Sequence, residues 1–379
     1  MAFGDFAESI GERAEPKDAQ EEIYVGLEHL DSQCLHIRRW GKGSDVTGTK
    51  LRFRKGDIIF GRRRAYQRKL AVAEFDGICS AHSLVVRAMP KIVLPEFLPF
   101  LMMSDRFMNR AVEISVGSLS PTINWTTLKL ETFDLPPLDE QRRIAEILWA
   151  VDEVAGRFED ALRTSDEALT TSLGAMFGNG QSNQQFKVLP LSGVARLQTG
   201  IAKGKKYPAS VKTVELPYLR VANVQDGHLN LSEMKTIVIP AAERDRYLLR
   251  NGDVVICEGG DYDKVGRGAI WREQVADCLH QNHVFSIRAE SSTVLPEFLA
   301  LQLASPYGKR YFLGCAKKTS NLASINSTQV KAFPFQVPSL MEQRAFIGDT
   351  AKLQTAREAF EAHTKAIRNS LAALTEAFI

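Results

Sequence analysis

Apolar residues follow two rhythms along this chain of 379 residues. In short runs bounded by Gly, Asp and Pro, such as residues 57–60, 83–86 and 253–256, they are typical of β-strands. Over residues 139–177, and again from Met341 onward, they recur every three or four positions, which predicts amphipathic helices. At 1.5 Å per residue, the first of these helices is about 60 Å long. The pattern therefore predicts the α+β class, with compact globules and two long helices.

Each long helix carries one narrow apolar seam. The seam residues include Ile144, Val151 and Phe158 in the first helix and Leu353, Phe360 and Ile367 in the second. A helix with one seam needs a partner to cover it, so two such helices are expected to pack together as a coiled coil, and the chain closes on itself if they pair antiparallel. The alternative is that each helix packs only on its own globule.

The chain also repeats itself. The letters Val-Leu-Pro-Glu-Phe-Leu at residues 93–98 return at 294–299, and other landmarks recur in the same order. A repeat of this length is a duplicated domain, because solenoid units are much shorter. The expected division is a first globule over 1–138, a first long helix over 139–178, a second globule over 179–338 and a second long helix over 339–379.

Composition narrows the class of protein. The formal net charge is only +3, so a polyanionic partner would have to bind a local basic patch. The five cysteines are scattered and never spaced C-x-x-C, which favours reduced thiols in the cytoplasm. No apolar run approaches the ~20 residues of a membrane span, and the first residues do not form a signal peptide. We expect a soluble cytoplasmic protein that does not bind membranes.

The densest basic run follows the predicted strand at residues 57–60. Arginine can contact phosphates and can bind guanine through two hydrogen bonds, and an aromatic side chain lies in the same run. The alternative is a solvated surface loop. The candidate DNA-contact residues here are Arg62, Arg63, Arg64, Tyr66, Arg68 and Lys69.

The corresponding loop of the second copy, residues 258–267, is sparser and partly acidic, so the two copies are expected to prefer different sequences. Its acidic residues Glu258, Asp261 or Asp263 can accept from cytosine N4. Basic and polar candidates in the second copy are Tyr262, Lys264, Arg267, Lys203, Lys205, Lys206, Lys317, Lys318 and Asn321. Ordinary surface lysines are the alternative.

Signatures of catalysis and of metal binding are weak. The chain has no phosphate-binding loop and no amino-methyltransferase motif, so no catalytic residue is assigned. Asp226, Glu233 and Lys235 distantly resemble a nuclease metal site, but in one copy only. His280 and His283 lack a completing cysteine or carboxylate, so no metal is assigned. His82 and His283 occupy equivalent places, which favours a shared structural role over base contact.

The ordered landmarks, present twice, resemble the specificity subunit of type I restriction–modification systems over essentially the whole chain. Those landmarks are the Gly-Asp strands at 56–58 and 252–254, the Leu-Pro-Glu-Phe-Leu helices, the loops at 117–124 and 319–326, and the Pro-x-Leu-x-Glu-Gln helix starts at 136–141 and 338–343. The first copy has fewer residues before Tyr24 than the second has between Val188 and Tyr218. We therefore expect the opening strand and loop of the first globule to be shortened or diverged.

The resemblance implies a non-catalytic protein with two target recognition domains, each reading half of a split site in double-stranded DNA. It implies that the helices pair antiparallel in a circular, pseudo-twofold arrangement, set the gap between half-sites and dock two methyltransferase subunits. Restriction or translocase subunits are further partners. S-adenosylmethionine, with ATP and Mg in a restriction complex, is expected on the partners.

The loop landmark adds Ser118 and Ser120 to the DNA-contact candidates. The expected docking and spacer residues are Glu140, Gln141, Ile144, Val151, Phe158, Glu342, Gln343, Leu353, Phe360 and Ile367. Two rival functions are a coiled-coil adaptor that does not bind DNA and a metal-dependent nuclease.

Overall fold

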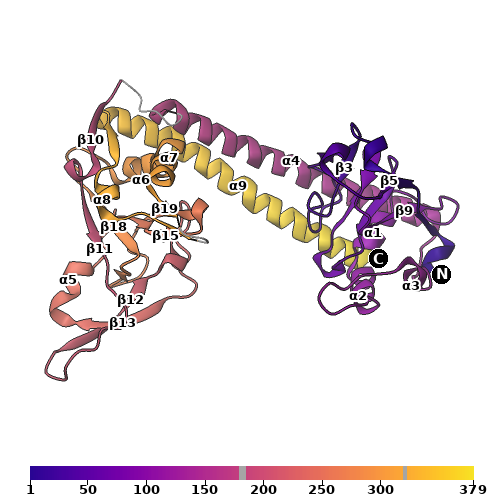
Figure 1. The fold of residues 1–379 in the computed structure, drawn as a ribbon, viewed down its shortest axis with the longest axis horizontal. Helices are drawn as coiled ribbons and strands as arrows, with labels where there is room; N and C mark the ends of the chain where they lie inside the picture. Colours follow the sequence, from indigo (N-terminus) through magenta and orange to yellow (C-terminus); the bar gives the residue numbers. More distant parts are fainter. Residues whose placement is uncertain (179–184, 319–321) are drawn as a thin grey trace. The chain divides into compact units, whose positions relative to one another are not determined.

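The computed structural model describes residues 1–178, 185–318 and 322–379. Contacts within the chain divide it into unit 1, residues 1–159 with 361–379, and unit 2, residues 160–360. Each unit combines sheets and short helices with part of each long helix (Figure 1). The predicted α+β class with two long helices is confirmed. None of the described helices combines the length and apolarity needed to cross a membrane.

Unit 1 contains two sheets. Across the first, which is antiparallel, the strands are β1 (Ala7–Ile10), β9 (Ser83–Ala88), β6 (Ile58–Gly61) and β7 (Leu70–Val72). Across the second they are β2 (Arg13–Ala14), β5 (Lys50–Phe53), β8 (Gly77–Cys79), β3 (Ile23–Val25) and β4 (Gly41–Lys42). The short helices are α1 (Leu98–Met103), α2 (Asp105–Glu113) and α3 (Trp125–Leu128).

Alternation along β6 gives the first sheet a core on each face. Successive strand residues point to opposite sides. Ile58 and Phe60 therefore pack with Phe107 of α2, whereas Ile59 packs with Phe53 of the second sheet. Because both faces are covered, all of β6 is buried and its sequence is apolar without interruption.

Unit 2 repeats the first sheet and adds three smaller ones. The repeated sheet is β11 (Ala195–Thr199), β18 (Val284–Ala289), β14 (Val254–Cys257) and β16 (Gly268–Ile270). The others are β13 (Lys235–Pro240), β12 (Thr213–Leu219) and β17 (Leu279–His280); β15 (Gly259–Gly260), β20 (Ala323–Ser324) and β19 (Lys317–Lys318); and β10 (Lys187–Pro190) with β21 (Pro334–Val337). The short helices are α5 (Arg244–Tyr247), α6 (Pro296–Ala304), α7 (Pro306–Cys315) and α8 (Ser327–Lys331).

One buried ion pair recurs in the two repeated sheets. The Asp57 carboxylate accepts two hydrogen bonds from Arg87, at 2.7 and 2.9 Å, and Asp253 accepts two from Arg288, at 2.7 and 2.6 Å. Both aspartates are buried. The same carboxylates also accept from the backbone N–H of Arg54 and Arg250. The Gly-Asp landmark is therefore a structural anchor that holds the turn before each central strand.

One expectation about local structure is corrected and another is borne out. The helix expected from Pro95 begins instead at Leu98, whereas its counterpart begins at Pro296 as predicted. The cause is Pro99, which has no N–H to donate and is tolerated only in the first helical turn. The opening strand of the first copy is the shorter one, as expected, because β1 has four residues and pairs with β9, whereas β11 has five and pairs with β18. The second copy is longer because it adds β10 and because its β12–β13 hairpin has longer strands than the equivalent β3–β4 pair of unit 1.

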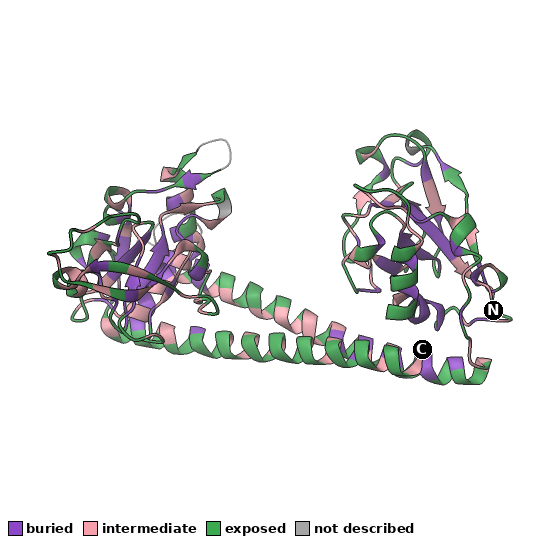
Figure 2. Cartoon of the chain, turned by 90° about the horizontal axis from the view of Figure 1, so that it is seen from below, coloured by how far each residue is buried: buried purple, intermediate pink, exposed green. Residues whose placement is uncertain are grey.

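The long helices are α4 (Leu138–Phe177) and α9 (Leu340–Phe378). In unit 1, Leu148 of α4 and Leu371 of α9 lie in one apolar core, and Phe158 stacks on His363 with ring centroids 5.2 Å apart. Residues later in α4 therefore contact residues earlier in α9, which shows that the two helices run antiparallel in this unit. Figure 2 shows that most of both helical surfaces is exposed. Each helix thus packs on its partner and also on a globule.

In unit 2 the helices meet at their other ends. Phe177 of α4 lies 5.4 Å from Phe346 of α9, between ring centroids, and both join the core around Phe298. Farther along, Arg357 donates to Asp166 at 2.5 Å. The pairing is again antiparallel.

Gln141 and Gln343 were predicted to dock a partner subunit. In the structure both side chains are buried and bond to the protein itself. Their exposed fractions are 1 % and 0 %. Gln141 accepts from Leu94 N–H and donates to the carbonyls of Ile92 and Pro136, at 2.8 to 3.0 Å. Gln343 makes the same three bonds to Leu295, Thr293 and Pro338. Each glutamine joins the start of a long helix to the loop before α1 or α6, so neither is available to a partner.

Replacing Gln343 by alanine should lower the free energy of unfolding by about 2–3 kcal/mol, because it leaves buried backbone groups without partners. Urea titration checks this. Arg344→Ala, at the exposed next position, is the control and should change stability by less than about 0.5 kcal/mol. Equal stabilities of the two variants would contradict the anchoring role.

Candidate nucleic-acid interface

The basic loop of unit 1, residues 62–69, connects β6 to β7. A short 3-10 helix at its centre, Ala65–Gln67, is flanked by Arg64 and Arg68, both with left-handed backbone (φ +60° and +49°). Non-glycine residues rarely adopt this conformation. Ala65 is buried and holds the turn, while the neighbouring side chains of Arg63, Arg64 and Tyr66 are exposed. The loop is therefore a tight, anchored turn that displays cations and one aromatic ring.

A second segment, the tip hairpin of residues 116–122, is bonded to the basic loop. Val116 and Thr122 exchange backbone hydrogen bonds of 3.0 Å, and Arg64 N–H donates to the Pro121 carbonyl at 2.7 Å. The Ser120 hydroxyl accepts from Arg63 Nε at 2.7 Å and from Arg64 Nε at 3.3 Å. The structure thus brings Ser120 together with two of the predicted arginines, and Ser118 lies in the same hairpin.

The remaining cations of the basic loop are held by the protein. Arg68 forms an ion pair with Asp105, and Lys69 Nζ donates to the Leu27 carbonyl at 2.6 Å. Arg62, Arg63 and Arg64 form no ion pair with an acidic side chain within the described residues. Positive charge is therefore concentrated on these three arginines rather than spread over the whole run.

In unit 2 the equivalent surface is built differently. The small sheet of β15, β20 and β19 places Lys318 Nζ 3.6 Å from the centre of the Tyr262 ring, a cation–π contact. Lys317 is exposed on the same strand, and Lys264 forms an ion pair with Asp261. Tyr262, Lys317 and Lys318 are thus brought together. Asn321 and the side chain of Asp263 lie outside the described part of the chain.

The other candidates of unit 2 divide into two groups. Lys203, Lys205 and Lys206 are exposed on the loop between β11 and β12, which is fixed where Ile201 N–H donates to the His280 carbonyl at 2.8 Å. Arg267, in contrast, turns inward and donates to the Val221 carbonyl at 3.3 Å. Arg267 therefore contacts the turn that follows β12, and its role in DNA binding stays a prediction.

The equivalent histidines do not share one role, contrary to expectation. The ring of His283 bonds to the Glu258 carboxylate, whereas the backbone N–H of His82 donates to the Ser80 hydroxyl at 3.2 Å. Copy one has Arg62 where copy two has Glu258. Burial, with the nearby charges of Arg63 and Arg62, lowers the pKa of His82, so its ring is neutral at pH 7. The two histidines thus have charges of opposite sign nearby, the arginines for His82 and Glu258 for His283.

The nuclease set is not assembled. Asp226 pairs with Lys309 at 2.5 Å, and Glu233 lies 3.6 Å from both Lys235 and Arg220. His280 is buried and bonded to the Val284 carbonyl. Within the residues that the structure describes, no group of three or more His, Cys, Asp or Glu is placed to hold a metal ion.

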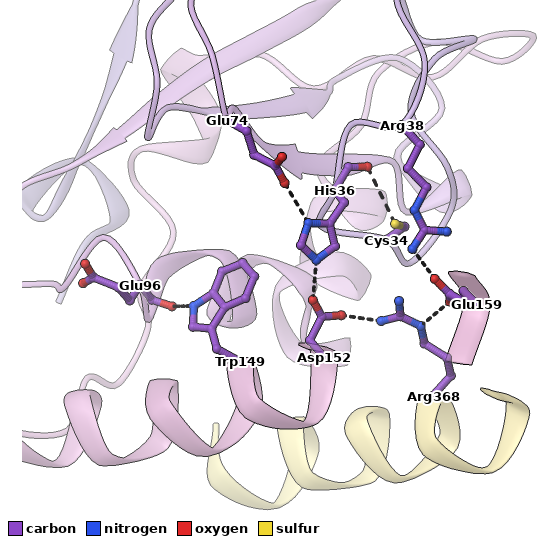
Figure 3. Close-up of polar contacts among 9 residues, drawn as sticks. All are labelled: Cys34, His36, Arg38, Glu74, Glu96, Trp149, Asp152, Glu159 and Arg368. Carbon is purple, nitrogen blue, oxygen red and sulfur yellow. Dashed lines mark hydrogen bonds and ion pairs between the residues drawn. The ribbon is translucent and has the colours of Figure 1, made fainter. Parts of the chain in front are cut away.

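Sequence reasoning missed a polar network between the first globule and the long helices (Figure 3). Asp152 of α4 is buried and accepts from His36 Nε2 at 2.6 Å and from Arg368 of α9. Arg368 also donates to Glu159 at 2.9 Å, and Glu159 pairs with Arg38. The network therefore ties one loop to both helices within unit 1.

The charges in this network are mutually stabilised. The hydrogen bond to Asp152 raises the pKa of His36 to about 9, against the opposing effect of burial. Burial alone would raise the pKa of Asp152, but its bonds from His36 and Arg368 hold that pKa below its usual value of 3.8. At neutral pH His36 is a cation and Asp152 an anion.

This geometry defines a two-unit α+β protein in which a repeated scaffold presents two different cationic surfaces. Residues 41–163 match the family model of the type I restriction modification DNA specificity domain. The chain is 23 % identical over 295 residues to the type I restriction enzyme EcoKI specificity subunit of Escherichia coli (strain K12), covering 74 % of this chain and 62 % of that protein. It is 21 % identical to the StySPI specificity subunit of Salmonella potsdam, covering 82 % and 67 %.

The fold is also found among solved structures. A chain from a type I R-M system, solved to describe complex assembly and conformational transition, has a TM-score of 0.56 and 21 % identity, covering 100 % of this chain and 95 % of that one. The chain is thus similar to type I specificity subunits, and the resemblance read from its repeated landmarks is confirmed. It spans somewhat less than two thirds of the length of the EcoKI subunit.

The His36–Asp152 pair predicts a pH-dependent stability. Because the folded pKa of His36 is raised, its contribution is complete below pH 6.5 and is lost as pH rises through about 9. After discounting for the partly exposed imidazole, we expect the free energy of unfolding to fall by about 1–2 kcal/mol across this range. Urea titrations from pH 6 to 10 measure it. His36→Gln, which does not titrate, is the control, and parallel curves for the two proteins would refute the assignment.

Proposed function

We propose that this chain is the DNA sequence-specificity subunit of a type I restriction–modification complex. Each unit reads one half of a bipartite site in double-stranded DNA and the chain itself performs no catalysis. The proposal rests on one contrast, namely that the buried bonds of the two units are the same whereas their exposed loops differ. The Asp–Arg anchors and the glutamine ties are repeated bond for bond. The loops after β6 and β14 differ in length and charge, because residues 62–69 hold five basic and no acidic residues whereas residues 258–267 hold two basic and three acidic ones.

In unit 1 the guanidinium groups of Arg62, Arg63 and Arg64, which form no ion pair with an acidic side chain of the described residues, supply the positive charge that attracts phosphates. Arginine can also bind guanine through two bonds. Ser120 orients two of these groups, so less side-chain entropy is lost on binding. In unit 2, Tyr262 and Lys318 offer a ring and a cation beside the acidic residues Glu258 and Asp261. Acidic side chains can accept from cytosine N4, so the two units should prefer different bases.

The partners would be two methyltransferase subunits, with restriction or translocase subunits in a larger complex. A docking surface in unit 1 is a hollow of about 350 Å³ on the helix pair, lined by Ala150, Val151, Val154, Ile367 and Ser370. Val154 is 43 % exposed there. S-adenosylmethionine would be held by the methyltransferase subunits, and ATP and Mg by restriction subunits. The complex would act in the cytoplasm, where it meets cellular DNA.

The first test is a genome-wide map of methylated adenines in cells that do and do not carry the chain with its methyltransferase subunits. A split motif methylated only in the presence of the chain is expected. On a duplex of that motif, Arg63→Ala with Arg64→Ala should reduce the slope of log affinity against log salt by roughly 2, because about 0.9 counterions are released per phosphate contact.

The control for this double variant is Arg106→Ala with Arg110→Ala, which removes two charges that are paired with acidic residues in the same unit. It should leave the slope unchanged. A motif that does not depend on the chain, or no binding of the duplex by the complex, would argue for the adaptor role instead.

Val154→Asp should weaken binding of a methyltransferase subunit at least about tenfold, because the new carboxylate is buried without a partner when the hollow is covered. Titration calorimetry or gel filtration of the mixed subunits measures it. Thr171→Asp, at an exposed position of α4 outside the hollow, should bind as the wild type does. Unchanged binding by Val154→Asp would exclude this surface.

A further inference from the structure

Leu119, at the end of the tip hairpin, is 92 % exposed. An apolar side chain at this position adds nothing to the core of unit 1, and its contact with water is unfavourable. Val116 of the same hairpin is also exposed, as is Tyr66 of the basic loop to which the hairpin is bonded. The folded chain alone gives no reason for this combination.

The hairpin that carries Leu119 is held rigidly. The reciprocal Val116–Thr122 bonds close it, and Gly117 makes its turn with a φ of +113°, which favours glycine. Ile123 N–H donates to the Arg62 carbonyl at 2.9 Å, just beyond the hairpin. The tip is therefore fixed before any ligand binds, so presenting Leu119 costs little conformational entropy.

The base of the hairpin is cationic. Ser120, the residue after Leu119, accepts from both Arg63 and Arg64. An acidic protein surface could pair with these guanidinium groups, but it would leave the leucine in a polar environment. A nucleic-acid duplex suits both the arginines and the leucine. Its phosphates can pair with the guanidinium groups, and the space between its stacked bases is apolar and can take a leucine side chain.

We propose that Leu119 acts as a wedge that enters the base stack of the half-site bound by unit 1 and opens one base step. This inference rests on the proposed function and deepens it. Unstacking costs free energy, which phosphate contacts to the arginines and burial of the leucine offset. An opened step would also make it easier for a partner enzyme to turn a nearby base out of the helix. The corresponding hairpin of unit 2 carries Leu322, 58 % exposed, one position further along.

The test uses the whole chain in complex with its methyltransferase subunits. The probe is a duplex of the mapped motif with 2-aminopurine placed in turn at each adenine of the half-site except the methylated one. Because 2-aminopurine brightens when it is unstacked, wild-type protein should raise the fluorescence at one position. Leu119→Ser should return it to the level of the free duplex and raise Kd about three- to tenfold, with the salt slope unchanged. Leu119→Met should restore the signal.

Leu130→Ser is the matched control, since Leu130 is 67 % exposed but lies outside the hairpin, and it should behave as the wild type. A mismatch at the opened step should tighten binding of the wild type more than that of Leu119→Ser. Tight binding without any rise in fluorescence would overturn the wedge and leave the proposed function intact. Failure of the complex to bind the duplex at low salt would overturn both.

Discussion

Neither unit of this protein closes its core without both long helices. Leu148 and Leu371 enter the core of unit 1 from opposite ends of the two helices, and Phe177 and Phe346 do the same in unit 2. The buried glutamines then fix where each helix leaves its globule. Because each helix is a continuous element that serves two cores, a change in its register would be felt in both. This requirement constrains the scaffold strongly and leaves the loops free to vary.

The freedom of the loops is visible at single positions. Arg62 and Glu258 follow equivalent strands, and with this difference His82 has the cations Arg63 and Arg62 nearby whereas His283 has a carboxylate partner. The backbone hydrogen bonds around them are retained, since Ile123 and Ile325 each donate to the carbonyl of that position. A scaffold that bonds through its backbone tolerates any side chain at the surface. Such an arrangement suits a protein that must acquire new binding preferences without refolding.

The sequence predicted features that depend on periodicity and on internal comparison. The seam spacing indicated α4 and α9, and the repeated Gly-Asp and Glu-Gln landmarks indicated a shared scaffold. It did not predict that Arg68, Lys69 and Arg267 turn to partners within the protein, because their partners Asp105, Leu27 and Val221 are distant along the chain. The His36–Asp152–Arg368 network was missed for the same reason. The spacing of apolar residues predicts which face of a helix is covered. It does not predict which loop of the globule packs on that face, such as the loop that carries His36.

The core of unit 1 has a consequence for the order in which the molecule matures. Residues 361–379 belong to this unit, and Leu371 lies in its core beside residues of α4. Chains fold as they emerge from the ribosome, generally from the N-terminal side. The part of unit 1 that precedes unit 2 must therefore wait for α9 before its apolar surface is covered, because unit 2 is translated in the interval. A chain whose synthesis stops before α9 would leave that part of the core exposed to water.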